Sequence, residues 1–458
     1  MTQDTIFAPS TAPGRAGVAV IRVSGPRTAE ALTALAGAPL PPPRRAALRQ
    51  VRDPVEGGVI DQGLLLWFPG PASFTGEDLG EFHLHGGRAV TAATLEALAA
   101  RPGLRPAEAG EFTRRAFDNG KLDLSAVEGL ADLIEAETEA QRRQAVRQLQ
   151  GGLARLTGDW AARLTRVLAH FEAAIDFAEE DLPESLGQAA LVRAAAVARE
   201  IEAALNDRHR GERLREGLSV VILGAPNAGK SSLLNALAQR DVAIVSETAG
   251  TTRDVIEVHL DLGGYPVTLA DTAGLRAMEG AEDPQAAIEA AGMARARQRA
   301  ASADVKLLLV DMETALESSA ALASAMGLYD ANSVVLLNKA DRCAEGAVQR
   351  LCAELKEWNP IVISAKTGTG LDAALRRLVD LAEDSFGGSE AAAGITRLRH
   401  RRALEDCRAA LARAGGAGLT ELVAEELRLA LRALGRISGR VDVEDILDIV
   451  FADFCIGK

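Results

Sequence analysis

The chain is poor in aromatic residues and cysteine, and it lacks long apolar runs. Aromatic residues make up 3% of its 458 residues, so its cores depend on Ala, Leu and Val, which favours helix-rich packing. The four cysteines (Cys343, Cys352, Cys407 and Cys455) are widely spaced without a CxxC pair, which argues against a disulfide framework or a zinc site. No membrane span or secretory signal is apparent, so we expect reduced thiols in a cytoplasmic protein.

The chain also lacks a net positive charge: its 64 Asp and Glu residues outnumber its 51 Lys and Arg residues, and the net charge is −13. A chain this acidic is not expected to coat nucleic acid non-specifically, since phosphate binding needs clustered Lys and Arg. One basic segment, TRLRHRRAL (Thr396–Leu404), allows two interpretations. It is either a local RNA-binding patch or, more commonly for such a run, a solvated helix face.

The first 118 residues have a mixed α/β pattern. Short β-rich runs bounded by Gly or Pro predict strands at Gly17–Gly25, Gly63–Phe68 and Glu81–Gly87. A helical pattern follows over Arg88–Ala100, and the proline-rich segment Pro39–Arg45 must be a loop. We therefore expect an N-terminal α+β domain.

The rest of the chain changes pattern twice. Residues 119–215 have the Ala- and Leu-rich spacing of a helical bundle, with a surface loop at Ala178–Ser185. In residues 216–384 strands alternate with helices, which predicts a parallel sheet covered on both faces. Residues 385–458 are helical again after a linker at Ser385–Gly394. The simplest arrangement inserts the α/β domain into one discontinuous helical domain.

Four motifs in the α/β region predict a nucleotide site. GAPNAGKS (Gly224–Ser231) follows a strand and opens a helix, as a phosphate-binding loop does. Its backbone N–H groups would surround the phosphates, Lys230 would reach the β- and γ-phosphates, and Ser231 would bind Mg²⁺. DTAG, NKAD and SAK follow in order, each at the end of a strand. The carboxylate of Asp341 can accept hydrogen bonds from N1–H and the N2 amine of guanine, so a GTPase of the Ras-like class is expected.

The predicted nucleotide-site residues come from these motifs and from the switch I segment SETAGTTRD. They are Asn227, Ala228, Gly229, Lys230, Ser231, Ser232, Ser246, Glu247, Thr248, Ala249, Gly250, Thr251, Thr252, Asp271, Thr272, Ala273, Gly274, Asn338, Lys339, Asp341, Ser364, Ala365 and Lys366.

The usual hydrolytic residues are missing. The position after the DxxG glycine, where Ras-like enzymes have a water-orienting Gln, is Leu275. No arginine is obviously placed as a finger, although Arg253 and Arg276 remain candidates. A K⁺ held by Asn227 and switch I carbonyls would neutralise the developing charge instead, and a switch II carboxylate would orient the water.

Over its whole length the sequence resembles the MnmE (also called TrmE) family of tRNA uridine-modification GTPases. The most specific shared segments are DTIFAPSTAPGRAGVAVIRVSG, SFTGEDLGEFHLHGG, EFTRRAFDNGKLDLSAVEGLADLIEAET and the terminal FCIGK. The GTPase motifs also match, but many families share them.

The resemblance implies a folate-binding N-terminal domain, a discontinuous helical domain and an inserted G domain. It implies a homodimer formed through the N-terminal domains, with K⁺-dependent pairing of the G domains during GTP hydrolysis. It also implies an FAD-containing partner, MnmG. The two proteins would add an aminomethyl or carboxymethylaminomethyl group to C5 of the wobble uridine of certain tRNAs, using a one-carbon unit from 5-formyl-tetrahydrofolate or a related folate.

The resemblance also assigns roles to individual residues. The implied ligands are, for K⁺, Asn227, Ser246, Thr248 and Thr251; for Mg²⁺, Ser231 and Thr252; and for folate, Arg22, Glu77, Lys121 and Lys458. Without the resemblance, Arg22, Glu77 and Lys121 would be taken as solvated side chains.

The catalytic assignments leave alternatives. Glu289 matches the family's catalytic glutamate in switch II, but this segment is longer than usual, so Glu279 and Glu282 compete with it. Cys455 is the second candidate catalytic residue, because the family's terminal C-x-G-K motif suggests a nucleophilic cysteine there. Lipidation of this cysteine is disfavoured, since Gly457 and a final Lys follow it. We expect the terminal tail to reach the folate site, and direct chemistry by the thiol stays open. A pure GTP switch is the competing function.

Overall fold

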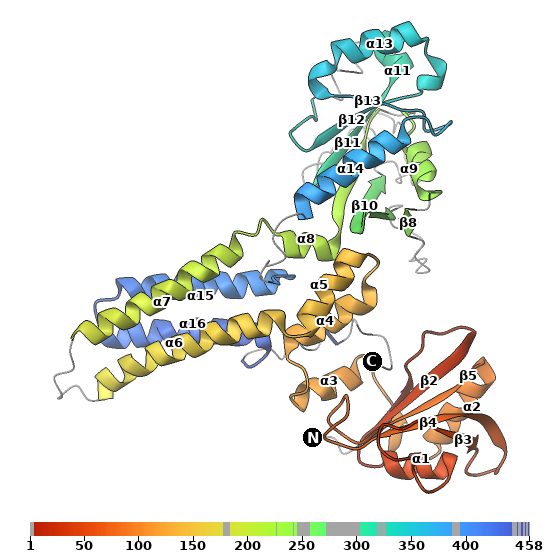
Figure 1. The fold of residues 1–458 in the computed structure, drawn as a ribbon, viewed down its shortest axis with the longest axis vertical. Coiled ribbons are helices and arrows are strands. Elements are labelled where there is room, and N and C mark those ends of the chain that lie inside the picture. The colour runs from red at the N-terminus through yellow and green to blue at the C-terminus, as the bar shows by residue number, and fades with distance from the viewer. Residues whose placement is uncertain are drawn as a thin grey trace, which may run out of the picture. The chain divides into compact units, whose positions relative to one another are not determined.

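The structure is a computed structural model, and its fold is shown in Figure 1. It describes residues 4–176, 184–225, 227–240, 242–244, 257–271, 303–317, 322, 327–386, 394–441, 447, 450–451, 454 and 457. Two compact units are present, one built from residues 1–131, 147–201 and 402–458, the other from residues 132–146 and 202–401. Each unit therefore combines segments that are far apart in the sequence.

The first unit contains a six-stranded sheet in the order β3-β4-β5-β2-β1-β6. The strands are β1 (Thr5–Pro9), β2 (Ala16–Ser24), β3 (Ala47–Arg52), β4 (Val59–Phe68), β5 (Leu79–Gly86) and β6 (Leu104–Pro106). All neighbours are antiparallel except β1 and β6, which are parallel. Helices α1 (Thr28–Ala36) and α2 (Arg88–Ala99) pack against one face over a core that includes Ile21, Leu32 and Phe82.

The predicted elements of this region are confirmed with small differences. The three predicted strands correspond to β2, β4 and β5, and the predicted helix to α2. Strand β4 begins at Val59, earlier than predicted, because the half-exposed residues before Gly63 still pair with β3. Residues 39–46 form the predicted loop.

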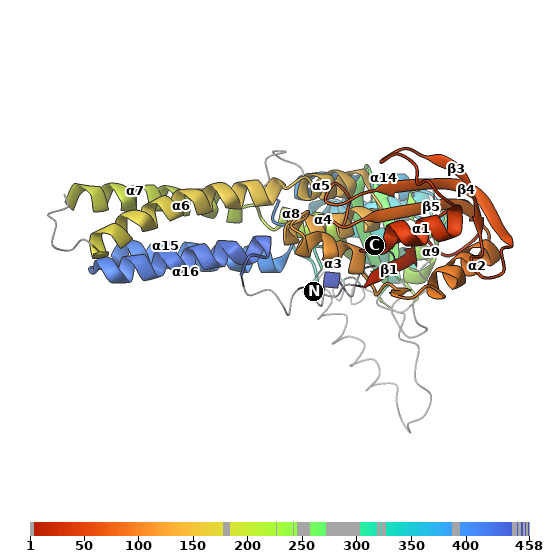
Figure 2. The ribbon, with the colours of Figure 1, turned by 90° about the horizontal axis from the view of Figure 1, so that it is seen from below.

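Helices from both halves of the chain form a bundle in the first unit. The helices that lie wholly or mostly in this unit are α3 (Glu111–Asp118), α4 (Leu124–Glu135), α6 (Gly152–Asp176), α7 (Glu184–Leu205), α15 (Leu398–Gly416) and α16 (Thr420–Ser438), whereas α5 (Glu139–Leu149) belongs mostly to the second unit. Helices α6, α7, α15 and α16 run side by side, as Figure 2 shows. Trp160 on α6 donates to Glu200 on α7 at 2.9 Å, and Arg428 on α16 donates to Glu172 on α6 at 2.6 Å.

The second unit is built on a seven-stranded sheet in the order β13-β12-β11-β7-β10-β9-β8. The strands are β7 (Leu218–Leu223), β8 (Ala243–Ile244), β9 (Glu257–Leu262), β10 (Tyr265–Asp271), β11 (Val305–Asp311), β12 (Ser333–Asn338) and β13 (Ile361–Val362). The five strands from β13 to β10 are parallel, and β9 and β8 add an antiparallel edge.

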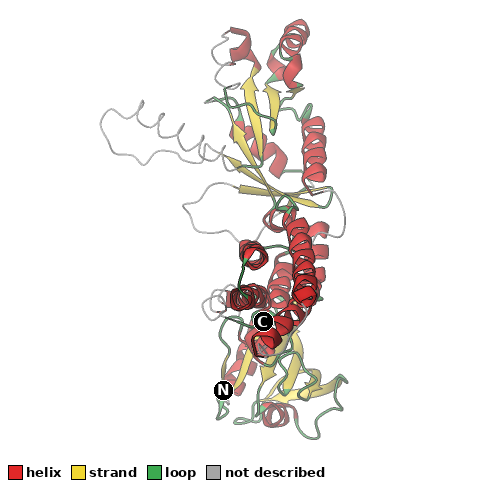
Figure 3. Cartoon of the chain, turned by 90° about the vertical axis from the view of Figure 1, so that its left-hand side faces the viewer, coloured by secondary structure: helices red, strands yellow, loops and turns green. Residues whose placement is uncertain are grey.

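Helices cover both faces of this sheet, as predicted and as Figure 3 shows. They are α8 (Arg210–Glu216), α9 (Lys230–Ala238), α11 (Met312–Glu317), α13 (Glu345–Glu354) and α14 (Leu371–Phe386), with short 3₁₀ turns at Ala340–Arg342 and Lys356–Trp358. One core cluster lies under α9 and α14, and another lies under α11 and α13. Within the described residues, no helix is both long and apolar enough to cross a membrane.

Neither interpretation of the basic segment Thr396–Leu404 is right for His400 and Arg401. His400 is fully buried, and the Arg401 side chain is 6% exposed between Glu212 and Asp207, at 2.8 and 2.7 Å. The guanidinium of Arg401 therefore stabilises the start of α15, whereas Arg402 at the next position is exposed. The predicted linker Ser385–Gly394 begins later than predicted, because α14 extends to Phe386, and the predicted loop Ala178–Ser185 ends earlier, because α7 begins at Glu184. Residues 178–183 and 387–393 of these two segments lie outside the described residues.

Candidate functional site

The phosphate-binding loop joins the end of β7 to the start of α9. Its backbone depends on glycine at two points. Gly229 has φ +97°, and a Cβ there would lie 2.4 Å from Nδ2 of Asn338; a Cβ on Gly224 would lie 2.3 Å from the carbonyl of Leu309. Asn227 is also left-handed, with φ +62°. Ser231 and Ser232 lie in the first turn of α9, where the positive end of the helix dipole favours a phosphate.

Lys230 is the cation of this loop. Its Nζ donates to the carbonyl oxygens of Gly224 and Ala225, both at 2.9 Å. The ammonium group therefore lies over the phosphate-binding loop, which α9 follows directly.

The base-binding motifs are attached to the phosphate-binding loop through Asn338. This side chain is 2% exposed, and its Nδ2 donates to the carbonyl of Ala228 at 2.8 Å. Its Oδ1 accepts from the N–H of Ala365 at 3.0 Å. One side chain thus joins the phosphate-binding loop, 110 residues earlier, to the SAK motif, 27 residues later, and it fixes the distance between the phosphate and base ends of the site.

Asp341 lies next to this joint. One oxygen of its carboxylate accepts a hydrogen bond from Ser364 Oγ at 2.7 Å. That bond lowers the pKa of Asp341, so the group is anionic at neutral pH, as an acceptor for two N–H groups must be. Lys339 has φ +66°, and its Nζ forms an ion pair with Asp311 at the end of β11, at 2.6 Å.

The other strands end at the same edge. Strand β10 ends at Asp271, the first residue of DTAG, and it pairs in parallel with β7. Because the carboxyl ends of parallel strands meet at one edge, Asp271 lies at the same edge as the phosphate-binding loop. Lys366 follows Ser364 in the loop after β13.

Several predicted residues lie outside the described residues. They are Ser246, Glu247, Thr248, Ala249, Gly250, Thr251, Thr252, Thr272, Ala273, Gly274, Glu279, Glu282, Glu289, Cys455 and Lys458, together with Arg253, Leu275 and Arg276. The described geometry therefore covers the base and the phosphate-loop side of the site.

Three of the four residues predicted for folate, Arg22, Glu77 and Lys121, surround one loop of the N-terminal domain, residues 70–78. Glu77 belongs to the loop, Lys121 Nζ donates to the carbonyl of Pro71 at 2.9 Å, and the Arg22 guanidinium lies 5.4 Å from the ring centre of Phe74. The fold thus brings together side chains separated by about a hundred positions in the sequence.

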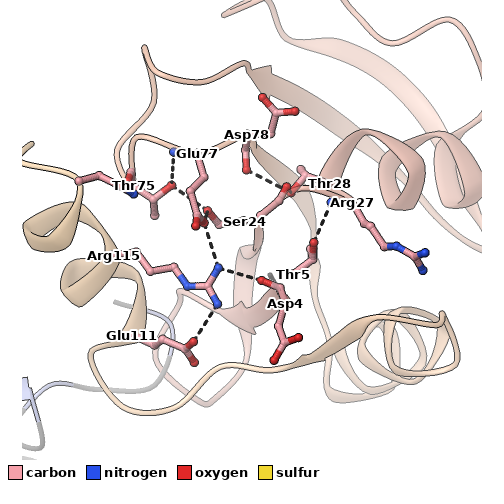
Figure 4. A network of polar contacts seen from close by, with 12 residues as sticks. Asp4, Thr5, Ser24, Arg27, Thr28, Thr75, Glu77, Asp78, Glu111 and Arg115 are labelled. Carbon is pink, nitrogen blue, oxygen red and sulfur yellow. Dashed lines mark hydrogen bonds and ion pairs between the residues drawn. The ribbon is translucent and has the colours of Figure 1, made fainter. Parts of the chain in front are cut away.

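Sequence reasoning missed the partners of these residues. Arg22 forms an ion pair with Glu81 at 3.1 Å, and Glu77 forms one with Arg115 at 3.0 Å. Figure 4 shows Arg115 between Glu77 and Glu111, with Ser24 also donating to Glu77. The Glu111–Arg115 spacing of four residues on a helix was the one available signal. The predicted solvated alternative is wrong for Arg22 and Glu77.

Glu111 carries the largest carboxyl shift of this network. Burial raises its pKa, but hydrogen bonds from Arg105, Arg115 and the N–H of Glu108 outweigh burial and lower the pKa from 4.5 to about 2. A lowered carboxyl pKa stabilises the fold above the unfolded value, and this stabilisation is lost as pH falls from about 4.5 toward 2.

We expect Glu111→Gln to cost about 3 kcal/mol at pH 7 and much less at pH 3. Hydrogen exchange of residues 104–118 in the full chain at both pH values measures this difference. Glu96→Gln, at an exposed position on α2, is the matched control and should change neither value. An equal cost at pH 7 and pH 3 would contradict the assignment.

The terminal tail returns to the N-terminal domain. Phe451 and Phe454 pack with Leu124 and Val127 of α4. Gly457 has φ +98°, its carbonyl accepts from Ser10 Oγ at 2.8 Å, and a Cβ on it would lie 2.0 Å from the carbonyl of Pro9. Ala8, the residue before Pro9 in β1, is the cross-strand partner of Arg22 in β2. The tail therefore ends near the polar cluster, at a position that requires glycine.

Two family profiles match the chain. "GTP-binding protein TrmE N-terminus" matches residues 5–121, and "MnmE helical domain" matches residues 124–455. The tRNA modification GTPase MnmE of Rhodospirillum rubrum is 54% identical over 472 residues, covering 100% of both chains. The protein of the same name from Methylobacterium sp. (strain 4-46) is 55% identical, covering 99% of this chain and 100% of its own.

Solved structures match part of the chain. A crystal structure of Aquifex aeolicus Era bound to GDP and AlF₄⁻ is 22% identical and covers 42% of this chain and 66% of that one. Its TM-score of 0.28 is too low to support an argument about the fold.

Proposed function

The chain belongs to the family of tRNA modification GTPases named MnmE, and on this premise we propose that it couples K⁺-dependent GTP hydrolysis to modification of a tRNA wobble uridine. The modification is at C5, the one-carbon unit comes from a tetrahydrofolate, and the FAD-containing protein MnmG is the partner. The observation that carries the GTPase part is the Asn338 joint, which holds the base and phosphate ends of one nucleotide site together.

The described residues divide the work of nucleotide binding. The loop around Gly229 and the start of α9 bind the phosphates, and Lys230 moves from its loop carbonyls to the β- and γ-phosphates. Asp341 accepts from N1–H and N2 of guanine while Ser364 holds its carboxylate in place. Buried Asn338 keeps these parts at a fixed distance, which lowers the cost of ordering the site on binding.

The cation ligands are proposed from residue chemistry. Oxygen donors suit Mg²⁺ and K⁺, and both Asn227 in the loop and Ser231 in the first turn of α9 supply such donors. Asn227, Ser246, Thr248 and Thr251 would hold K⁺, while Ser231 and Thr252 would hold Mg²⁺. A bound K⁺ supplies positive charge beside the phosphates, and Glu289 would orient the attacking water.

The polar cluster around residues 70–78 supports the folate proposal. Arg22 and Lys121 provide cations for the glutamate tail of a folate, and Glu77 provides an acceptor for ring N–H groups. Arg115 and Glu81 hold Glu77 and Arg22 in fixed orientations. The tail that carries Cys455 and Lys458 ends beside the same strands, since Gly457 contacts Pro9 and Ser10.

A homodimer is supported by apolar side chains that are exposed on strands β2, β3 and β4 of the N-terminal sheet. Leu48 on β3 and Leu64 on β4 are cross-strand partners, and they are 59% and 41% exposed. Val18 on β2 is 53% exposed. A second copy of this domain would remove these apolar side chains from water.

Hydrolysis should be at least about tenfold faster in K⁺ than in Na⁺ at equal ionic strength, because only a well-fitted cation stabilises the transition-state charge. Phosphate release from GTP in the two salts measures this ratio. Asn227→Ala should lower the rate in K⁺ and bring the ratio close to one. Equal rates in both salts would remove the cation argument and direct attention to Arg253 or Arg276.

Nucleoside mass spectrometry tests the tRNA part. In tRNA from a strain lacking this gene, the modified wobble uridine should be absent, and the wild-type gene should restore it. Unchanged modification would leave the alternative of a pure GTP switch. The N-terminal polar cluster and the terminal tail favour the modification enzyme, because a switch does not need either.

A further inference from the structure

Strand β5 carries a row of ionisable side chains on the face of the N-terminal sheet opposite the core that contains Phe82 and Leu84. Phe82 and Leu84 point into the core, so the alternate residues Glu81, His83 and His85 share the opposite face. Glu81 bonds Arg22 through one oxygen and His83 Nε2 through the other, both at 3.1 Å. The row therefore begins at the cluster proposed to bind folate and continues about 13 Å along the strand to His85.

His85 is held by Asp61 of the neighbouring strand β4. Its Nδ1 lies 2.9 and 3.1 Å from the two oxygens of the Asp61 carboxylate. The backbone N–H groups of His85 and Gln62 also donate to this carboxylate, at 2.8 and 2.7 Å. Burial raises the pKa of Asp61, but these hydrogen bonds outweigh it and lower the pKa, so the group is anionic.

The two side chains differ sharply in exposure. The Asp61 side chain is 12% exposed and the His85 side chain is 74% exposed. The bond from the His85 N–H to Asp61 already ties the two strands together at this point, so the imidazole is not needed for that purpose. With Nδ1–H donated to a carboxylate, the ring presents Nε2 outward as a proton acceptor, and no described residue hydrogen-bonds that atom. A carboxylate orients a catalytic imidazole in the same way in serine hydrolases.

We propose that His85 is a proton-transfer residue of the tRNA-modification reaction and that Asp61 is its positioning residue. This proposal rests on the function proposed above. Its ligand is the one-carbon tetrahydrofolate adduct held by Arg22 and lying along β5. When an amine attacks a one-carbon unit held as a methylene iminium on the folate nitrogen, the new C–N bond uses the amine's lone pair. The C=N π pair returns to the folate nitrogen, and the attacking nitrogen becomes positive. That nitrogen gives one proton to Nε2, the imidazolium is stabilised by Asp61, and the proton then passes to water.

The test uses the full chain reconstituted with its FAD-containing partner and substrate tRNA. His85→Ala should slow formation of the modified uridine by about 10²-fold, the usual size of a general acid–base contribution. Asp61→Asn, which keeps the shape but not the charge, should also slow it. Added imidazole should restore a measurable part of the rate to His85→Ala and none to Asp61→Asn. GTP hydrolysis in the same preparations reports that the second unit is folded.

The matched control is His170→Ala, an exposed histidine on α6. It should modify tRNA at the wild-type rate. A wild-type rate in His85→Ala, with active wild-type protein, would overturn the proton-transfer role and leave the proposed function intact. Loss of rate without imidazole rescue, accompanied by loss of the dimer in sedimentation, would also overturn it and assign His85 to packing. An inactive wild type would overturn the proposed function and this inference together.

Discussion

Asp341→Asn is expected to change the preferred nucleotide from GTP to xanthosine triphosphate. The carboxylate can accept hydrogen bonds from both N1–H and the N2 amine of guanine, whereas an amide has one acceptor and would place its NH₂ group against the N2 amine. Xanthine has an oxygen at that position, so the amide then has a partner for both of its groups. The change needs no movement of the backbone, because Ser364 can donate to the amide oxygen as it does to the carboxylate.

The affinity for GTP should fall by about 10²-fold or more, since two hydrogen bonds to a charged acceptor are replaced by one good bond and one clash. The affinity for xanthosine triphosphate should rise by a similar factor. Titration with fluorescent analogues of both nucleotides measures the two constants. Asp380→Asn is the matched control, because this residue is exposed on α14 in the same unit. If both variants bind GTP equally well, Asp341 does not contact the base.

The phosphate and base motifs were predictable because each depends on a few neighbouring residues. A strand, a glycine that tolerates φ +97° and a helix start are encoded within Gly224–Ser231, and the structure has all three. The ends of β10 and β12 at Asp271 and Asn338 were predicted for the same reason, since apolar runs of strand length stop there. Only the joint through Asn338 needed the tertiary structure.

Partners on neighbouring strands were not predictable. The pairs Arg22–Glu81 and Asp61–His85 depend on which strands are adjacent and on their register, and a shift of one residue would turn each side chain to the other face. The interpretation of the basic segment at the start of α15 was wrong for Arg401 for a related reason. Its composition shows positive charge, but the acids that neutralise Arg401 lie almost two hundred residues earlier.

Arg401→Met should destabilise the second unit by about 3–5 kcal/mol, because it leaves two buried carboxylates without their cation. Arg401 donates to Glu212 at 2.8 Å, to Asp207 at 2.7 Å and to the carbonyl of Leu205 at 2.9 Å. Hydrogen exchange of residues 202–216 in the full chain gives the free energy of opening in the wild type and the variant. Arg402→Met, at the exposed next position, should stay within about 0.5 kcal/mol of the wild type.

Two further measurements separate electrostatics from lost packing. Adding Asp207→Asn and Glu212→Gln to Arg401→Met removes the uncompensated charges, and most of the stability should return. The pH dependence should also change. In the wild type, burial raises the pKa of Glu212, but the bond to Arg401 outweighs it and lowers that pKa, so stability falls as pH falls. Without the cation, burial raises the pKa of Glu212, so protonation at low pH removes the uncompensated charge. The loss of stability in the variant should therefore become smaller below about pH 5. A deficit that is independent of pH and persists in the triple variant would mean that the arginine stem, and not its charge, holds α8 against α15.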